Sequence, residues 1–378
     1  AEIERQGLLE RDLEIGNTVV DTYAKFGMLG KAYEVFERLQ HKNTASWNAL
    51  LAGYTEQGNI EEAMRCFRCM ELERIVVDEI TLVYALKLCS ITRDVEKGRE
   101  IHAQCVERED SMERDNLVGS SLVDMYGKCG FLISSAHVFD GLSNRDIVSW
   151  TALITGYSEH GHNEEALKCF VQMQAEGVFP NAVTIHCVLK SCSTLQAIKK
   201  GQEIHTMIKG NKLLLDHFVC SMLVDMYARC GSLATAQKAF DKLRDRHVVS
   251  WTMLLTGYEE HGCGKEAIHC FRQMIVEGVS PNVVTFICIL KACGSIRAAD
   301  KGKEIHKELV TRGLLKESIA AGNALVDMYV KCGELARAQQ VLKELPHRDV
   351  VSWSSLISGF SQHGQWHEAL ECLDWMQK

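Results

Sequence analysis

Proline is nearly absent from this sequence, whose 378 residues include only three, Pro180, Pro281 and Pro346. Because proline breaks helix interiors, most of the chain is free to form helices. There is also no run of eighteen apolar residues, so no transmembrane helix is expected. Alternation of apolar and polar residues, the pattern of a half-buried β-strand, is missing as well. These absences favour an all-helical protein.

An excess of positive charge is also lacking, because the formal net charge is −8, whereas nucleic-acid-binding domains are usually basic. No Gly-rich phosphate loop, Ser/His/Asp constellation or pair of catalytic carboxylates stands out. His162 and Glu164 superficially resemble the His-x-Glu of zinc deaminases, but no Pro-Cys-x-x-Cys follows them. We therefore predict that this chain is not an enzyme, has no catalytic residues and takes no cofactor or small-molecule substrate.

Cysteine is plentiful, with sixteen residues spread through helical patterns. This distribution indicates buried free thiols in a reducing compartment. The one Cys-x-x-Cys motif, Cys66 and Cys69, has no second pair to complete a zinc site. Three recurring histidines, His102, His205 and His306, are too far apart in a helical array to share a metal. No metal site is predicted.

Tryptophan marks an internal period. Trp47, Trp150, Trp251 and Trp353 are separated by 103, 101 and 102 residues. The stretch 147–181 recurs as 248–282, with a divergent copy at 44–78 and a shortened one at 350–378. A fixed period of this kind indicates a repeat array. The chain starts at Ala1 without a signal or transit peptide, and both ends fall inside repeats, so we interpret it as a piece of a longer array.

Three kinds of unit alternate along the chain. A short unit carries L-V-D-M-Y-x-[KR]-C-G, the second carries the tryptophan, and a long unit carries G-x-E-I-H or a near match. The predicted short units are 13–43, 116–146, 217–247 and 319–349; the tryptophan units are 44–78, 147–181, 248–282 and 350–378; the long units are 79–115, 182–216 and 283–318, with a partial one at 1–12.

Each unit has the pattern of two amphipathic helices separated by a turn. A single helix pair cannot bury its own apolar face, whereas stacked pairs can. We therefore predict an all-α fold, an α-α superhelix (solenoid) of about eleven stacked helix-turn-helix repeats. The Trp, Tyr, Phe and Met stripes are assigned to its core.

Together, L-V-D-M-Y-x-K-C-G, V-S-W-T-A-L-I-x-G-Y and G-x-E-I-H resemble the pentatricopeptide repeat (PPR) proteins of land-plant organelles. The subclass is the one of alternating long (L), short (S) and 35-residue (P) repeats, abbreviated PLS. Tetratricopeptide repeats fit less well, because their W-x-x-L-G-x-x-Y register does not match Trp150 to Tyr157.

The resemblance implies a single-stranded RNA-binding module that reads one base per repeat. It also implies the targeting part of a C-to-U RNA editing factor in a mitochondrion or chloroplast, with any deaminase-like domain outside this chain and organellar editing proteins as partners. The alternative is a protein-interaction solenoid that recruits editing or RNA-processing proteins. No membrane partner is predicted.

In this family the base-reading residues are the fifth and the last of each repeat. The resulting pairs are Asn17/Asn43, Asn48/Asp78, Ser120/Asp146, Thr151/Asn181, Ser221/His247, Thr252/Asn282 and Asn323/Asp349, with Ser354 beginning another. The alternative for the last residues is that Asp and Asn are simply helix N-caps. That alternative does not account for Asn, Ser or Thr at the fifth position. The L repeats carry Val83, His186 and Ile287 there, so we expect them to discriminate poorly.

Hydrogen-bonding edges predict which bases these pairs favour. A carboxylate acceptor suits the ring N–H of uracil or guanine, and an amide suits adenine or cytosine. Short Ser or Thr favours purines and Asn favours pyrimidines. With the N-terminal repeats at the 5′ side, as the family implies, the predicted RNA is 5′-YUNGANRANUR-3′.

Two further sets of residues complete the predicted site. Apolar residues at the second position are expected to stack against bases: Leu117, Val148, Phe218, Val249 and Val351, with Ala320 at the same place. Ordinary packing between hairpins is the alternative. Cations at position thirteen of the S repeats are expected to contact phosphates: Lys25, Lys128, Arg229 and Lys331. Four such contacts predict a log–log salt slope of roughly −3.

Overall fold

The computed structural model describes residues 13–107, 116–209, 217–243 and 245–377. The predicted partial repeat at 1–12 lies outside these residues, as do the ends of two predicted L repeats at 108–115 and 210–216. The chain forms two compact bodies, Ala1–Ser191 and Cys192–Lys378.

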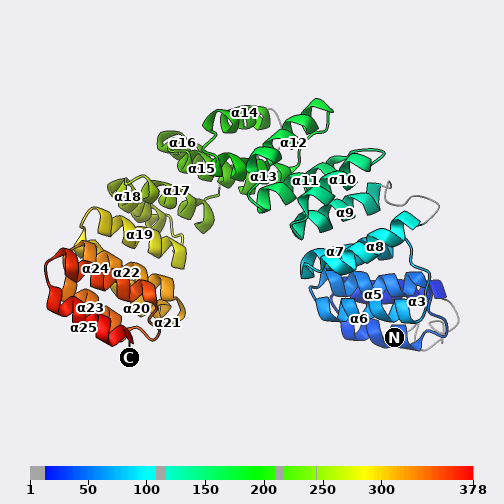
Figure 1. Cartoon of the computed structure of the whole chain (residues 1–378), viewed down its shortest axis with the longest axis horizontal. Coiled ribbons are helices and arrows are strands. Elements are labelled where there is room, and N and C mark those ends of the chain that lie inside the picture. Colours follow the sequence, from blue (N-terminus) through cyan, green and yellow to red (C-terminus); the bar gives the residue numbers. More distant parts are fainter. Residues whose placement is uncertain (1–12, 108–115, 210–216, 244, 378) are drawn as a thin grey trace. The chain divides into compact units, whose positions relative to one another are not determined.

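Every secondary-structure element in the first body's described residues is an α-helix (Figure 1). These are α3 (Leu13–Lys25), α4 (Leu29–Arg38), α5 (Thr44–Glu56), α6 (Ile60–Leu72), α7 (Glu79–Thr92), α8 (Val95–Glu107), α9 (Asn116–Lys128), α10 (Leu132–Gly141), α11 (Ile147–Glu159), α12 (Asn163–Ala175) and α13 (Ala182–Thr194), whose last turn passes the boundary.

The described part of the second body is also all-helical. Its helices are α14 (Ile198–Lys209), α15 (His217–Arg229), α16 (Leu233–Asp241), α17 (Val248–Glu260), α18 (Gly264–Val276), α19 (Val283–Ser295), α20 (Ala299–Thr311), the single turn α21 (Leu314–Glu317), α22 (Ile319–Lys331), α23 (Leu335–Glu344), α24 (Val350–Gln362) and α25 (Trp366–Gln377).

Within each body, the helices pair into hairpins that stack in chain order. In the first body, for example, α5 packs against α6 of its own hairpin and against α3 and α7, the first helices of the neighbouring hairpins. In the second body, α22 packs in the same way against α23, α19 and α24. The predicted all-α solenoid of helix-turn-helix repeats is confirmed. The division into S, P and L repeats stays a prediction.

The turn inside each hairpin requires a left-handed residue. In the hairpin of α11 and α12 this residue is Gly161, with φ of 79°, which glycine adopts without steric cost. The hairpins of the predicted L repeats instead use Arg93, Gln196 and Arg297, with φ of 56°, 52° and 55°. A side chain in this conformation costs about 1–2 kcal/mol.

The tryptophans join consecutive hairpins. The ring of Trp150 is 1% exposed and meets Phe139 of the preceding hairpin edge-on, with 4.5 Å between ring centroids. Trp251 meets Phe240 at the same distance, and Trp47 meets Phe36 at 4.7 Å. These three tryptophans are core residues, as predicted.

The glycine of the G-x-E-I-H motif marks another contact between hairpins. A Cβ added to Gly302 would fall on the sulfur of Met328, which belongs to the V-D-M-Y motif of the next hairpin. In the same way, a Cβ on Gly98 would meet the sulfur of Met125, and a Cβ on Gly201 would meet the sulfur of Met226. The absence of a side chain at these positions lets the methionine pack against the helix backbone.

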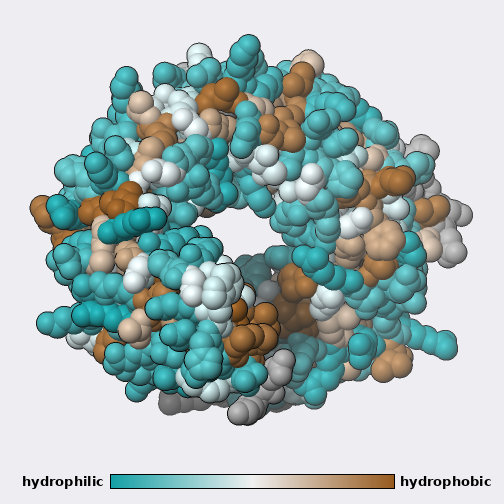
Figure 2. All heavy atoms as spheres, turned by 60° about the vertical axis from the view of Figure 1, so that its left-hand side comes forward, coloured by the Kyte–Doolittle hydropathy of each residue, from teal (hydrophilic) through white to brown (hydrophobic). Residues whose placement is uncertain are grey.

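On the surface, hydrophilic residues cover most of the face seen in Figure 2, and apolar residues form separate patches. Among the described helices, none combines the length and the apolar character that crossing a membrane requires.

Candidate nucleic-acid interface

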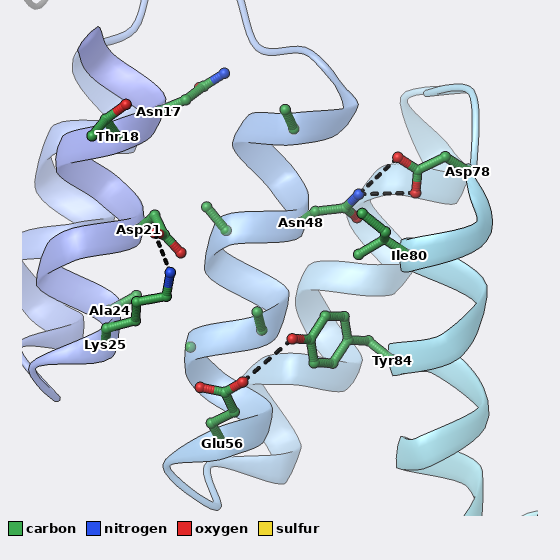
Figure 3. Close-up of a pocket in the computed structure, with 14 residues that line it drawn as sticks. Asn17, Thr18, Asp21, Ala24, Lys25, Asn48, Glu56, Asp78, Ile80 and Tyr84 are labelled. Atoms are coloured by element: carbon green, nitrogen blue, oxygen red, sulfur yellow. Dashed lines mark hydrogen bonds and ion pairs between the residues drawn. The ribbon is translucent and has the colours of Figure 1, made fainter. Parts of the chain in front are cut away.

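The two members of each predicted reading pair belong to neighbouring hairpins, because the last residue of one repeat directly precedes the first helix of the next. Asn48 lies on α5 and Asp78 is the N-cap of α7. The Asn48 Nδ2 group donates to Asp78 Oδ1 and Oδ2 at 2.9 and 3.0 Å (Figure 3). Two residues thirty positions apart in the chain therefore form one polar unit.

The other pairs with Asn at the fifth position have the same geometry. Asn323 Nδ2 donates to both oxygens of Asp349 at 3.1 and 3.0 Å. Asn17 Nδ2 donates to Asn43 Oδ1 at 3.2 Å. The structure thus brings the members of all three pairs into direct contact.

Most of the last residues also cap helices. Their Oδ1 atoms accept the backbone N–H of the third residue of the next helix, in the combinations Asn43/Ser46, Asp78/Thr81, Asp146/Ser149, Asn181/Thr184, Asn282/Thr285 and Asp349/Ser352, at 2.8–3.0 Å. His247 makes no such bond. These residues are therefore helix N-caps, a role that is compatible with a second one. Whether they also read bases stays a prediction.

The cap fixes which atom of the side chain is left over. A backbone N–H can only donate, so the atom that meets Thr184 N must be the oxygen of Asn181. Its Nδ2 group has no partner among the described residues and remains available as a donor. In Asp146, Oδ1 accepts the backbone N–H groups of Val148 and Ser149, and Oδ2 remains available as an acceptor.

Pairs with Thr at the fifth position are connected through a third residue. Thr184 Oγ1 lies 2.7 Å from Thr151 Oγ1 and donates to Asn181 Oδ1 at 2.9 Å. Thr285 Oγ1 likewise lies 2.8 Å from Thr252 Oγ1 and donates to Asn282 Oδ1 at 2.8 Å.

The serines at the fifth position are not joined to their predicted partners. Ser120 Oγ is buried and has no hydrogen-bond partner among the described residues. Ser221 and Ser354 donate to carbonyls of their own helices, His217 O and Val351 O, at 2.9 and 3.0 Å. The ring of His247 meets that of His217 instead, with centroids 5.8 Å apart.

Two of the reading carboxylates are held ionised. Burial opposes ionisation of Asp78, but hydrogen bonds from Thr81 and Asn48 lower its pKa below the ordinary value. The backbone N–H of Ser352 and the amide of Asn323 lower the pKa of Asp349. Both side chains are therefore acceptors at neutral pH, as uracil or guanine recognition requires.

Predicted residues from successive repeats line common hollows in the first body. A hollow of about 450 Å³ is lined by Asn17, Asn48 and Asp78 together with Lys25 (Figure 3). A second hollow, of about 620 Å³, is lined by the pairs Ser120/Asp146 and Thr151/Asn181. The arrangement offers paired polar groups to an elongated ligand.

The apolar residues predicted to stack on bases are exposed. Leu117, Val148, Phe218, Val249 and Val351 are 51–58% exposed. The same second position of the L repeats carries Ile80, Val183 and Val284, which are 51–52% exposed. The sequence interpretation missed these three, although their offset from the start of the repeat identifies them.

Each predicted phosphate contact is paired with an aspartate one turn earlier on its own helix. The ion pairs are Lys25–Asp21, Lys128–Asp124, Arg229–Asp225 and Lys331–Asp327, with N–O distances of 2.7–2.9 Å. These cations therefore add less positive potential than they would alone.

A second set of cations, also missed in the sequence, occupies position nine of the L repeats: Lys87, Lys190 and Lys291. Lys87 lines the larger hollow beside Lys128 and has no ion-pair partner among the described residues. Lys291 Nζ lies 4.0 Å from Glu259, at the limit of an ion pair.

No cluster of three or more His, Cys, Asp or Glu side chains suited to a metal occurs in the described segments. All sixteen cysteines are free thiols, and burial raises the pKa of Cys66 to about 12.

Models of known families match much of the chain. A model described as the PPR repeat family matches residues 145–194 and 246–295, and one described as the PPR repeat matches residues 17–44, 45–75, 323–350 and 351–378. In structure, the chain is similar to the pentatricopeptide repeat protein PPR10 from maize, crystallised with an 18-nucleotide psaJ RNA element. The TM-score is 0.79 at 18% identity, over 97% of this chain and 56% of that one. At this identity the likeness concerns the fold.

Two proteins of Arabidopsis thaliana are similar in sequence. The chloroplastic pentatricopeptide repeat-containing protein At4g18520 is 37% identical over 95% of this chain, and At5g27110 is 33% identical over 97%. The chain spans 58% and 53% of their respective lengths. The matched repeats, the relatives and the stacked helical hairpins show that this chain belongs to the pentatricopeptide repeat family.

Proposed function

We propose that the chain is a sequence-specific single-stranded RNA-binding module that reads one base with each S or P repeat. The observation that carries the proposal is the recurring pair at the fifth and last positions. The cap leaves a defined donor on Asn181 and a defined acceptor on Asp146. Such groups suit the edges of unpaired bases. The RNA bound by the similar maize protein supports the proposal.

The expected RNA is 5′-YUNGANRANUR-3′, with the three N positions facing the L repeats. The exposed second-position residues would lie between neighbouring bases and favour stacking without sequence preference. No catalytic constellation is part of the proposal. The chain would target an activity supplied elsewhere, namely C-to-U editing in a chloroplast or mitochondrion, and the name of the chloroplastic relative supports an organelle.

The test is binding of the 378-residue chain to an RNA of the predicted sequence and to a scrambled RNA of the same composition. Since one edge contact contributes about 1–3 kcal/mol of discrimination, several mismatches should weaken binding by a hundredfold or more. Equal affinity for both RNAs would exclude base reading. If neither RNA binds but purified editing-complex proteins do, the protein-interaction alternative holds.

A further inference from the structure

A buried hydroxyl follows every reading pair described by the structure. The third residue of the next first helix is always Ser or Thr, and each is at most 1% exposed. These residues are Ser46, Thr81, Ser149, Thr184, Ser250, Thr285 and Ser352. The hydroxyls of Ser46, Ser149, Thr285 and Ser352 accept the backbone N–H of the N-cap residue and so complete a capping box. That role does not account for Thr81, whose hydroxyl is equally buried and forms no such box.

In four of the seven, the hydroxyl touches both members of the pair. The distances to the fifth and last residues are 2.6 and 2.9 Å for Ser46, 2.7 and 2.7 Å for Thr81, 2.7 and 2.9 Å for Thr184, and 2.8 and 2.8 Å for Thr285. One hydroxyl thus lies within hydrogen-bond distance of both members of the pair. For Ser46 and Thr81 both neighbours are acceptors, so the single hydroxyl hydrogen is shared between them. Thr151 has no other connection to Asn181.

In the other three, the hydroxyl is turned back to the carbonyl of its own N-cap. Ser149, Ser250 and Ser352 donate to Asp146 O, His247 O and Asp349 O at 2.9–3.0 Å. At two of these sites a polar atom of the fifth residue is buried without a partner among the described residues, namely Ser120 Oγ and Asn323 Oδ1. No threonine adopts this orientation.

We infer that the third residue of the following repeat is a positioning residue for base recognition wherever its hydroxyl contacts both members of the pair. This inference rests on the proposed function. A hydroxyl bound to both members holds the fifth side chain and the last one in a single arrangement before RNA arrives. A prearranged site avoids the entropy cost of ordering its groups on binding, and it penalises a base that does not fit.

The chain therefore contains two classes of reading pair. The linked pairs are Asn17/Asn43, Asn48/Asp78, Thr151/Asn181 and Thr252/Asn282, and these should discriminate sharply. The pairs without a hydroxyl link are Ser120/Asp146, Ser221/His247 and Asn323/Asp349, the last of which is held by its direct contact alone, and these should tolerate more bases. The fifth and last residues alone do not distinguish the classes, because Asn48/Asp78 and Asn323/Asp349 have identical side chains.

The experiment removes the hydroxyl with little change of shape. Thr184→Val keeps the backbone N–H that donates to the capping side chain of Asn181 but leaves Thr151 unlinked. Binding is measured on four RNAs that differ only at the nucleotide facing Thr151/Asn181. We expect the preference for adenine over guanine to fall roughly fivefold, the effect of one hydrogen bond. Thr184→Ser, which retains the hydroxyl, should keep most of the preference.

A matched control is Ser149→Ala, which removes a hydroxyl that bonds only the backbone of Asp146 and neither side chain of its pair. It should leave the preference at its own nucleotide unchanged. Circular dichroism establishes that each variant is folded, and Thr285→Val repeats the test in the second body. If the unmodified chain discriminates and both valine variants discriminate equally well, the inference is wrong and the proposed function stands. If the unmodified chain shows no preference among the four bases, the proposed function is wrong, and this inference is wrong as well.

Discussion

The Nδ1 atom of His306 lies 2.9 Å from the phenolic oxygen of Tyr329 on the next hairpin. The histidine ends a G-x-E-I-H motif and the tyrosine belongs to L-V-D-M-Y. His102 and Tyr126, and His205 and Tyr227, are paired at 2.9 and 2.8 Å. The two motifs that mark the predicted L and S repeats thus contribute the two halves of one contact, which gives these recurring histidines a packing role.

Removing the hydroxyl from one such contact should destabilise the array. Tyr329→Phe leaves the ring in place and deletes the hydrogen bond, so we expect a loss of about 0.5–1.5 kcal/mol in the free energy of unfolding. Urea denaturation measures it. Tyr33→Phe is a control, because that side chain is 48% exposed and should change stability little. Equal effects would show that the His306 contact contributes nothing.

The same contacts should make stability depend on pH. Burial lowers the pKa of His306, with Arg337 adding to the effect and Glu344 opposing it. Burial, Lys209 and Lys242 lower the pKa of His205. Because the pKa of each histidine is lower in the folded chain, the unfolded chain binds protons at a higher pH. The stability that the neutral histidines contribute is therefore present above about pH 6.5 and is lost as the pH falls.

Urea midpoints at pH 7.5 and 5.5 provide the measurement. The unmodified chain should lose stability at the lower pH, and a variant with both His205→Gln and His306→Gln should lose less. A pH dependence that the double substitution leaves unaltered would locate the titrating groups elsewhere.

The fold was predictable because it follows from periodicity, which is written in the sequence. The fixed spacing from Trp150 to Trp251 implies stacked equivalent hairpins. The pairing of His306 with Tyr329 was not predictable, since it depends on how one hairpin rotates against the next. The predicted reading pair Thr151/Asn181 was assigned from the sequence, but its linkage through Thr184 exists only when two hairpins meet.

One feature of the site was available in the sequence and was overlooked. The motif L-V-D-M-Y-x-K places an aspartate four residues before the cation, a spacing that brings side chains together on a helix. Asp124 and Lys128 accordingly form an ion pair at 2.9 Å. The cation at position thirteen is therefore partly neutralised by its own helix.

Releasing that cation should strengthen RNA binding. In Asp124→Asn, Lys128 loses its ionic partner and becomes free to contact phosphate. We expect tighter binding and a log–log salt slope steeper by about 0.7, the contribution of one phosphate contact on a single strand. Lys87→Ala should make the slope shallower by a similar amount.

The control for this charge change is Asp140→Asn. Asp140 lies on α10, a second helix, where it pairs with Arg145 at 3.4 Å. It changes the net charge equally but should leave the slope unaltered. If both substitutions steepen the slope alike, the effect comes from total charge and Lys128 has no special contact.

The helices α9 and α11 approach each other so closely that alanine should not fit at Gly156 without a loss of stability. A Cβ on Gly156 would lie 2.9 Å from Gly127 Cα, a backbone atom that cannot move aside cheaply. Gly156→Ala should therefore destabilise the chain by about 1–3 kcal/mol, despite the better helix propensity of alanine. Gly30→Ala, also within a helix, meets nothing within 4 Å and should be neutral or stabilising by up to about 1 kcal/mol. Thermal denaturation of the two variants compares them directly.

The most direct test of base reading exchanges one atom of Asn181. In the present arrangement Oδ1 accepts from Thr184 N, and Nδ2 is left as a donor, which suits the ring nitrogen of adenine. Asn181→Asp preserves the cap, because a carboxylate oxygen also accepts that N–H. The remaining atom becomes an acceptor, which suits the ring N–H of guanine. Thr151 is unchanged, so the preference for a purine should persist.

Preference at that one nucleotide should therefore turn from adenine to guanine, by roughly tenfold or more in relative affinity, for an edge contact of about 1–3 kcal/mol. Binding to four RNAs that differ only at this nucleotide measures the switch. Asn282→Asp serves as the matched control, because Thr252/Asn282 has the same side chains as Thr151/Asn181. It should switch the preference at its own nucleotide and leave the preference at the nucleotide facing Thr151/Asn181 unchanged. A chain that still prefers adenine after Asn181→Asp would show that Asn181 is a helix cap and nothing more.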